Sequence, residues 1–174
     1  GRRIVEEVGL DKLLRWLPEE CDADEAMQVL LNLDLHVSAV PGSRREMQVS
    51  QALAREALLS VMAPARSRWA AMGDEGRARW DLIVLSGATL AQTAHPGQAV
   101  LIALDTLQPI GVSALALDAQ NMSAMAGVLG TLEPLAAAQV LETDGFLALG
   151  SVVAPRGRGR PGEVALRVKI AYAD

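Results

Sequence analysis

A run of small residues, Ser86-Gly87-Ala88-Thr89, directly follows the apolar segment LIVL at residues 82–85. In α/β proteins, ligands bind beyond the carboxyl ends of strands, where small side chains let the backbone approach the ligand and the next helix offers N–H donors. The run is therefore a candidate ligand-binding turn. The alternative is a tight strand-to-helix turn that binds nothing.

A second candidate is the segment PRGRGRPG at residues 155–162, in which Arg156, Arg158 and Arg160 alternate with glycines. Guanidinium groups pair with phosphates and with acidic surfaces, so these arginines are candidates for phosphate or partner contact. The alternative is a β-hairpin whose charged tip faces water. Nucleic acid is not expected as a partner, because no aromatic residue flanks the arginines and the net charge of the chain is −5.

The residue types of common catalytic and metal sites are sparse. His36 and His95 lie far apart, and Cys21 is the single cysteine, so the sequence holds no spaced Cys/His set for zinc. His95 precedes Pro96, which is typical of a helix start or a surface position. The sequence has no Walker A, Gly-x-Gly-x-x-Gly or Gly-x-Ser-x-Gly motif. We therefore expect no metal site and no catalytic activity from this chain alone.

The elements that position these residues fall into two parts. Residues 1–80 are predicted to be mainly helical, with one helix over 8–17 that Pro18 ends. Asp22 and Ser43 are each followed three residues later by glutamate, the signature of a helix N-terminus. The helix after Ser43 is predicted to end before Pro64.

Residues 81–174 are predicted to form an α/β core. LIVL lacks polar alternation and is predicted to be a strand buried on both faces. A helix over 96–107 and a strand over 112–118 complete a βαβ unit, and two helices rich in small residues follow at 123–132 and 133–141. Strands over 146–153 and 163–172 are predicted to form a C-terminal β-hairpin. The 174 residues are expected to form one compact domain.

Charge divides the chain into three zones, with net charges of −2 for residues 1–80, −6 for 81–155 and +3 for 156–174. The middle zone contains no Lys or Arg, so it is expected to pack against the first zone or against a partner surface. The hydrophobic fraction of 51% excludes a disordered chain. The single cysteine fits a reducing compartment, and a cytoplasmic location is expected, without a signal peptide or membrane span.

Four segments resemble the glutamate mutase L proteins, accessory proteins encoded beside adenosylcobalamin-dependent amino-acid mutases. They are DLIVLSGATL at 81–90, HPGQAVLIALDTLQPIGVSALALD at 95–118, LGTLEPLAAAQVLE at 129–142 and FLALGSVVAPRGRGRPGEVALRV at 146–168. The helix at 51–58 is only weakly similar. LDTLQP and LGSVVAPRGR are long and unusual enough to make the resemblance fairly specific.

The resemblance implies a member of the actin, sugar kinase and Hsp70 ATPase superfamily, in which two lobes close on a nucleotide. It implies an actin-like ATPase lobe with a ribonuclease H-like βαβ unit, an N-terminal helical segment and a C-terminal β-hairpin. The segment Leu85-Ser86-Gly87-Ala88 then takes the place that contacts adenosine, with Thr89 beside it. The family pattern there is closer to Gly-Ser-Gly-Gly, so Leu85 and Ala88 replace two glycines. The Asp-x-Gly-x-Thr phosphate loop of the first lobe does not occur in the sequence.

Because the chain starts at Gly1, we expect it to be the C-terminal part of a longer, two-lobed protein. The expected function is that of an accessory, chaperone-like or reactivating ATPase for glutamate mutase, with ATP or ADP bound by the longer protein. Expected partners are the missing N-terminal lobe, the cobalamin-dependent mutase subunits and a second copy of the chain. The alternative is a protein-interaction module without nucleotide binding. A third alternative is an independent small-molecule enzyme, for which the sequence nominates no residues.

Overall fold

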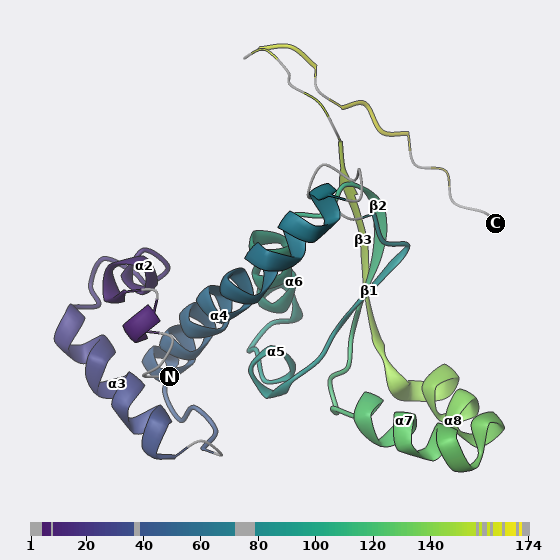
Figure 1. The fold of residues 1–174 in the computed structure, drawn as a ribbon, viewed down its shortest axis with the longest axis horizontal. Helices are drawn as coiled ribbons and strands as arrows, with labels where there is room; N and C mark the ends of the chain where they lie inside the picture. Colours follow the sequence, from purple (N-terminus) through teal and green to yellow (C-terminus); the bar gives the residue numbers. More distant parts are fainter. Residues whose placement is uncertain are drawn as a thin grey trace.

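A layer of helices and a small sheet make up the computed structural model (Figure 1), a mixed α/β fold. The structure describes residues 5–7, 9–36, 39–71 and 79–155, and, in the C-terminal part, residues 157, 160, 162–164, 166–169 and 171. Its helices are α2 (Leu10–Leu14), α3 (Ala23–Leu35), α4 (Arg44–Ala71), α5 (Ala88–Ala91), α6 (Pro96–Leu107), α7 (Ser123–Leu132), α8 (Pro134–Val140) and the π-helix η1 (Leu141–Gly145). Its strands are β1 (Leu82–Leu85), β2 (Gly111–Leu117) and β3 (Leu147–Ala154).

The two predicted helix starts are confirmed. The Asp22 carboxylate accepts a hydrogen bond of 2.6 Å from the Glu25 N–H at the start of α3. At the start of α4, the Ser43 hydroxyl accepts from the Glu46 N–H at 3.1 Å, while the Glu46 carboxylate accepts from the Ser43 N–H at 3.2 Å. These bonds satisfy N–H groups that have no partner inside the helix.

The predicted end of α4 before Pro64 is wrong, because the helix continues through Pro64 to Ala71. Proline removes one helical hydrogen bond, so contacts elsewhere must hold the last turns. The Arg66 guanidinium donates to the backbone carbonyl of Thr106 at the end of α6. The Trp69 ring packs edge-on against Trp80, with ring centroids 5.5 Å apart. Tertiary contacts thus stabilise the helix beyond its proline.

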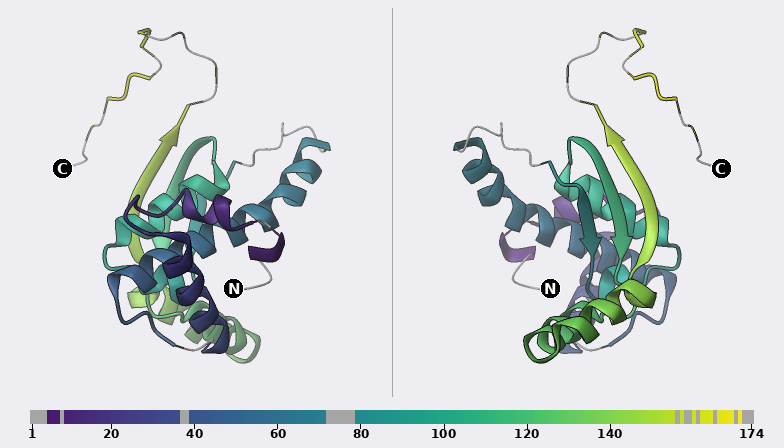
Figure 2. Two further views of the ribbon diagram at one scale, coloured as in Figure 1. Left: turned by 90° about the vertical axis from the view of Figure 1, so that its left-hand side faces the viewer. Right: turned by 90° about the vertical axis from the view of Figure 1, so that its right-hand side faces the viewer.

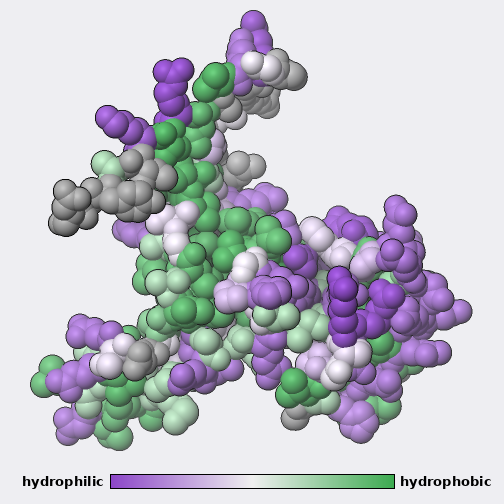
Figure 3. All heavy atoms as spheres, turned by 180° about the vertical axis from the view of Figure 1, so that it is seen from behind, coloured by the Kyte–Doolittle hydropathy of each residue, from purple (hydrophilic) through white to green (hydrophobic). Residues whose placement is uncertain are grey.

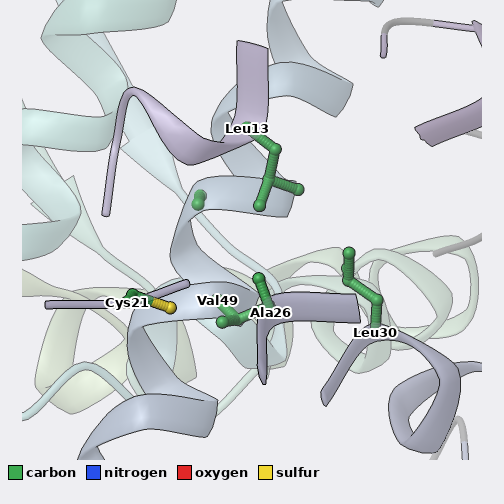
Figure 4. Packing of buried hydrophobic residues seen from close by; sticks show 6 residues of the cluster. Leu13, Cys21, Ala26, Leu30 and Val49 are labelled. Carbon is green, nitrogen blue, oxygen red and sulfur yellow. The ribbon is translucent and has the colours of Figure 1, made fainter. Parts of the chain in front are cut away.

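The N-terminal helices share a small apolar core (Figure 4) whose buried members are Leu13, Cys21, Ala26, Leu30, Val49 and Ala52. Beside this core lies a buried carboxylate, Glu56 of α4, which is 3% exposed. Its Oε1 atom accepts hydrogen bonds from the Arg15 guanidinium at 2.7 Å and from the Trp16 indole N–H at 2.6 Å. Glu56 therefore ties the end of α2 to the middle of α4.

The predicted βαβ unit is confirmed. β1 and β2 are parallel, with Leu82 beside Ala114 and Leu85 beside Leu117, and α6 lies in the connection between the two strands. β3 pairs antiparallel with the other edge of β2, so the strand order is β1-β2-β3. The predicted helices at 96–107 and 123–132 and the strand near 146–153 are also present.

One face of the sheet, here called the inner face, packs against α6. Ile83, Leu85, Leu115 and Leu117 form a buried cluster with Ala99 and Ala103 of that helix. The opposite side of α6 contacts α4. The small alanine side chains let the helix approach the sheet closely.

The expectation that LIVL is buried on both faces is wrong. On the opposite face, here called the outer face, Leu82 is 54% exposed, Val84 39% and Val112 64%. The right panel of Figure 2 shows this face of the strands, with α7 and α8 only across its lower end. Figure 3 shows apolar side chains gathered there and on α7 and α8. The uncharged sequence of the middle zone is therefore only partly buried within the described chain.

The predicted second strand of the C-terminal hairpin is not formed within the described residues. Residues 163, 164, 166–169 and 171 are not in a strand, and Figure 1 shows the described tail leading away from the sheet. β3 does form, paired with β2.

Arg156 and Arg158 lie outside the described residues, and Arg160 is exposed. Within the described chain, none of the helices combines the length and hydropathy that crossing a membrane requires.

Replacing the buried carboxylate by Glu56→Ala is expected to lower the free energy of unfolding by about 2–3 kcal/mol, because it leaves the Trp16 N–H without its acceptor and opens a cavity. Urea unfolding followed by tryptophan fluorescence measures the change. The matched control is Glu19→Ala at an exposed position, which should change the stability little. Equal destabilisation by both variants would contradict the role assigned to Glu56.

Candidate functional site

The candidate turn lies at the edge of the sheet where the parallel strands end. Ser86 and Gly87 follow β1, and Asp118 directly follows β2. The Asp118 N–H donates to the Leu85 carbonyl at 2.8 Å, which continues the strand pairing to this edge. The structure therefore brings the turn together with a carboxylate that is 32 residues away in the chain. This is the edge at which α/β sheets bind ligands.

The Asp118 side chain is fully buried, with 0% exposure, and accepts four hydrogen bonds. Its Oδ2 atom accepts from the Ser86 hydroxyl at 3.0 Å and from both the N–H and the hydroxyl of Ser123. Its Oδ1 atom accepts from the Met122 N–H at 2.7 Å. The carboxylate therefore joins the turn after β1 to the start of α7.

Two opposing effects act on the pKa of Asp118. Burial raises this pKa, but the hydrogen bonds from Ser123, Met122 and Ser86 favour the carboxylate and lower the pKa to about 2. Asp118 is thus ionised at neutral pH and has its oxygens occupied. It positions the turn and is poorly suited to act as a general base.

Gly87 has a backbone conformation that requires glycine. Its φ is +105°, and no atom lies within 4 Å of the position that a Cβ would take. The Gly87 N–H donates to the Asn121 side-chain oxygen at 3.0 Å, and Asn121 itself has a positive φ of 53°. The backbone at Gly87 is therefore held in place from one side while the space beside its Cα is open.

Ala88 and Thr89 begin the short helix α5, with Ala88 exposed and Thr89 half-buried. The Gly87 carbonyl accepts from the N–H groups of Leu90 and Ala91 at 3.0 and 2.9 Å. These two donors are used within the turn, so α5 offers fewer N–H groups to a ligand than the sequence pattern indicates. The open surface of Gly87 and Ala88 is the part of the turn that a flat ligand can approach.

The other candidates lie apart from this edge. His95 precedes α6, and its N–H lies 3.5 Å from the side-chain oxygen of Gln98, at a groove that the segment 41–43 and the start of α4 also line. Within the described residues, no group of three or more His, Cys, Asp or Glu side chains is arranged to hold a metal ion.

The sequence pattern predicted the turn as a candidate site. It did not predict Asp118, Asn121 and Ser123, whose hydrogen bonds hold the turn in place. The signal for Asp118 is its position at the end of a predicted strand of the βαβ unit, because the carboxyl ends of parallel strands meet at one edge. Asn121 and Ser123 carry no comparable signal, since their contacts depend on the loop after β2.

The conservative variant Asp118→Asn is expected to lower the free energy of unfolding by about 1–3 kcal/mol at neutral pH. The asparagine side-chain NH2 group would face N–H and O–H groups that are themselves hydrogen-bond donors. Since the pKa of Asp118 is lowered from 3.8 to about 2, its contribution is present above pH 3.8 and is lost as the pH falls toward 2. The stability difference between the native protein and the variant should therefore shrink over this range. Urea unfolding at a series of pH values measures it.

The control for this experiment is Asp81→Asn, at an exposed position one residue before β1. Its stability should follow that of the native protein across the series. A difference between the native protein and Asp118→Asn that stays constant down to pH 2 would contradict the assigned role of the Asp118 carboxylate.

Comparison with known proteins gives one family. The family model described as MutL protein matches residues 2–144. No curated protein and no solved structure matches the chain. The matched range includes the N-terminal helices, most of which lie outside the segments that carry the resemblance described above. It stops before β3, although the segment 146–168 also carries that resemblance. It contains the turn at Ser86 and the carboxylate of Asp118. Because the match covers most of the chain, the protein belongs to the MutL family, the glutamate mutase L proteins.

Proposed function

We propose that this chain is the nucleotide-facing lobe of an accessory ATPase that acts on an adenosylcobalamin-dependent glutamate mutase. Membership of the MutL family associates the chain with glutamate mutase. The chaperone-like or reactivating role and the actin-like lobe are part of the proposal. In it, the turn over Ser86, Gly87, Ala88 and Thr89 lies beside adenosine.

The observation that carries the proposal is the open backbone at Gly87. The glycine lies at the carboxyl edge of parallel strands, its N–H is fixed by Asn121, and the space beside its Cα is free. A flat base needs a surface of this kind, rigid and without protruding side chains. The network around Asp118 supplies the rigidity, because it fixes Ser86 immediately before the glycine.

ATP hydrolysis needs more than this edge. The segment that contains the turn, residues 80–155, has no Lys or Arg of its own to hold a phosphate. In the proposed assembly, the phosphates are held by another part of a longer protein, and this chain contributes the adenosine side. Arg156, Arg158 and Arg160 remain candidates for phosphate or partner contact.

A second candidate function is that of a protein-interaction module without nucleotide binding. The observation in its favour is the set of exposed apolar side chains on α7 and α8, where Met125 is 74% exposed, Val128 66%, Leu132 75% and Leu135 72%. Such residues in a segment without Lys or Arg indicate a surface that another protein covers. This function and the nucleotide role make different predictions at Ala88.

The test is calorimetric titration with ATP and ADP of this chain and of a longer MutL-family protein that contains it. The variant Ala88→Leu is preferable to a substitution of Gly87, whose positive φ strains any larger residue. We expect Ala88→Leu to weaken nucleotide binding by about tenfold or more, because the larger side chain meets the base and such overpacking costs ~1–3 kcal/mol. The chain alone should bind more weakly than the longer protein.

The matched control is Gln92→Leu, which places the same side chain at the exposed far end of α5. It should leave the affinity unchanged, and circular dichroism should show both variants folded. Unchanged affinity in folded Ala88→Leu would overturn the adenosine role of the turn. Binding of glutamate mutase subunits without any nucleotide binding would favour the interaction module.

A further inference from the structure

We propose that the C-terminal tail, residues 162–171, pairs as a fourth strand with the free edge of β3 in a second copy of this chain. The structure carries both halves of this contact, a strand edge and a strand-like segment, and among the described residues of one chain the two do not pair. The inference concerns assembly and is independent of the proposed nucleotide role.

The edge of β3 has little protection against pairing. β3 is hydrogen-bonded to β2 along one edge, and no described strand lies along its other edge. Its eight residues, LALGSVVA, contain no charge and no proline. Charged residues and prolines are the usual means by which an edge strand avoids pairing with other chains. The one irregularity is a bulge at Leu149 of β3, where Leu115 pairs with Gly150 and Ala116 with Ala148, and the strand continues without interruption from Gly150 to Ala154.

The described tail has the pattern of a half-buried strand but has no strand partner. Val164 is 76% exposed, Leu166 46% and Val168 53%, and in the sequence they alternate with Ala165, Arg167 and Lys169. In a strand, these three apolar side chains share one face and the two cations the other. The described part of the chain therefore leaves these three side chains uncovered.

The edge and the tail are complementary. Leu149 and Val152 of β3 lie half-buried beside the inner-face cluster. With its apolar side chains on the inner face, the tail extends this apolar layer and leaves Arg167 and Lys169 on the outer face. The cations meet no like charge there, because residues 80–155 contain no Lys or Arg and residues 81–155 have a net charge of −6.

The connecting segment favours exchange between copies over a hairpin within one chain. Residues 155–162 contain Pro155, Pro161 and three arginines. Like charges repel each other and prolines favour extended backbone, while the three glycines of the segment let the linker leave the sheet in more than one direction. Figures 1 and 2 show the described tail directed away from its own sheet. A tail that leaves its own sheet is free to pair with a second copy, and reciprocal exchange closes a two-fold dimer.

The first test is cross-linking of the full chain in a Cys21→Ser background. One preparation carries Ser151→Cys on the outer face of β3, and the other carries Lys169→Cys in the tail; both positions are exposed. After mixing, a short bis-maleimide should link one chain of each kind, and Leu166→Pro in the tail should abolish the product. No mixed product would overturn the proposal.

A single chain that carries both cysteines separates exchange from a hairpin. Exchange predicts covalent dimers whose yield falls on dilution. Cross-links only within monomers, at every concentration, would show that the tail pairs with its own β3 and would overturn the proposal.

The second test is the dimer Kd from light scattering over a dilution series. We expect Leu166→Pro to raise it by about tenfold or more, since proline removes a backbone donor and an apolar side chain from the new strand. The control Leu166→Ile keeps both and should leave the Kd within about twofold. A native chain that is monomeric at every concentration, or a dimer that Leu166→Pro leaves intact, would overturn the proposal.

Discussion

Helix α6 is the layer on which the rest of the described structure depends. Its alanines pack against the inner face of the sheet, and its opposite side contacts α4. Arg55 of α4 makes an ion pair of 2.9 Å with Asp105 of α6 and also lies over the Trp16 ring, with its guanidinium carbon 5.3 Å from the ring centre. The helix thus connects the apolar core of the N-terminal helices to that of the sheet.

The same helix determines where the candidate turn lies. Because α6 links β1 to β2 in parallel, the carboxyl ends of both strands reach one edge, and Ser86 meets Asp118 there. The buried carboxylate fixes this edge through hydrogen bonds and does not itself offer a reactive group. A rigid, open turn without catalytic side chains is consistent with one half of a nucleotide site whose chemistry is completed elsewhere.

Coverage of the sheet by α6 on one face leaves the other face apolar and exposed. The middle zone is expected to pack against the N-terminal helices or a partner, but of those helices α4 contacts α6, and Leu82, Val84 and Val112 on the outer face stay exposed. Exposed apolar side chains therefore remain on the strands, on α7 and α8 and in the described tail.

Local sequence determined the helix starts at Asp22 and Ser43, the βαβ unit and the glycine turn, because capping, apolar periodicity and backbone freedom act over a few residues. The family resemblance was also readable from the sequence. Only the tertiary structure decided that α4 continues through Pro64, that the outer face stays exposed and that the described residues of the tail form no strand beside β3. It also decided that Asp118 holds the turn. These features depend on contacts between residues far apart in the chain, and such contacts leave no periodic pattern in the sequence.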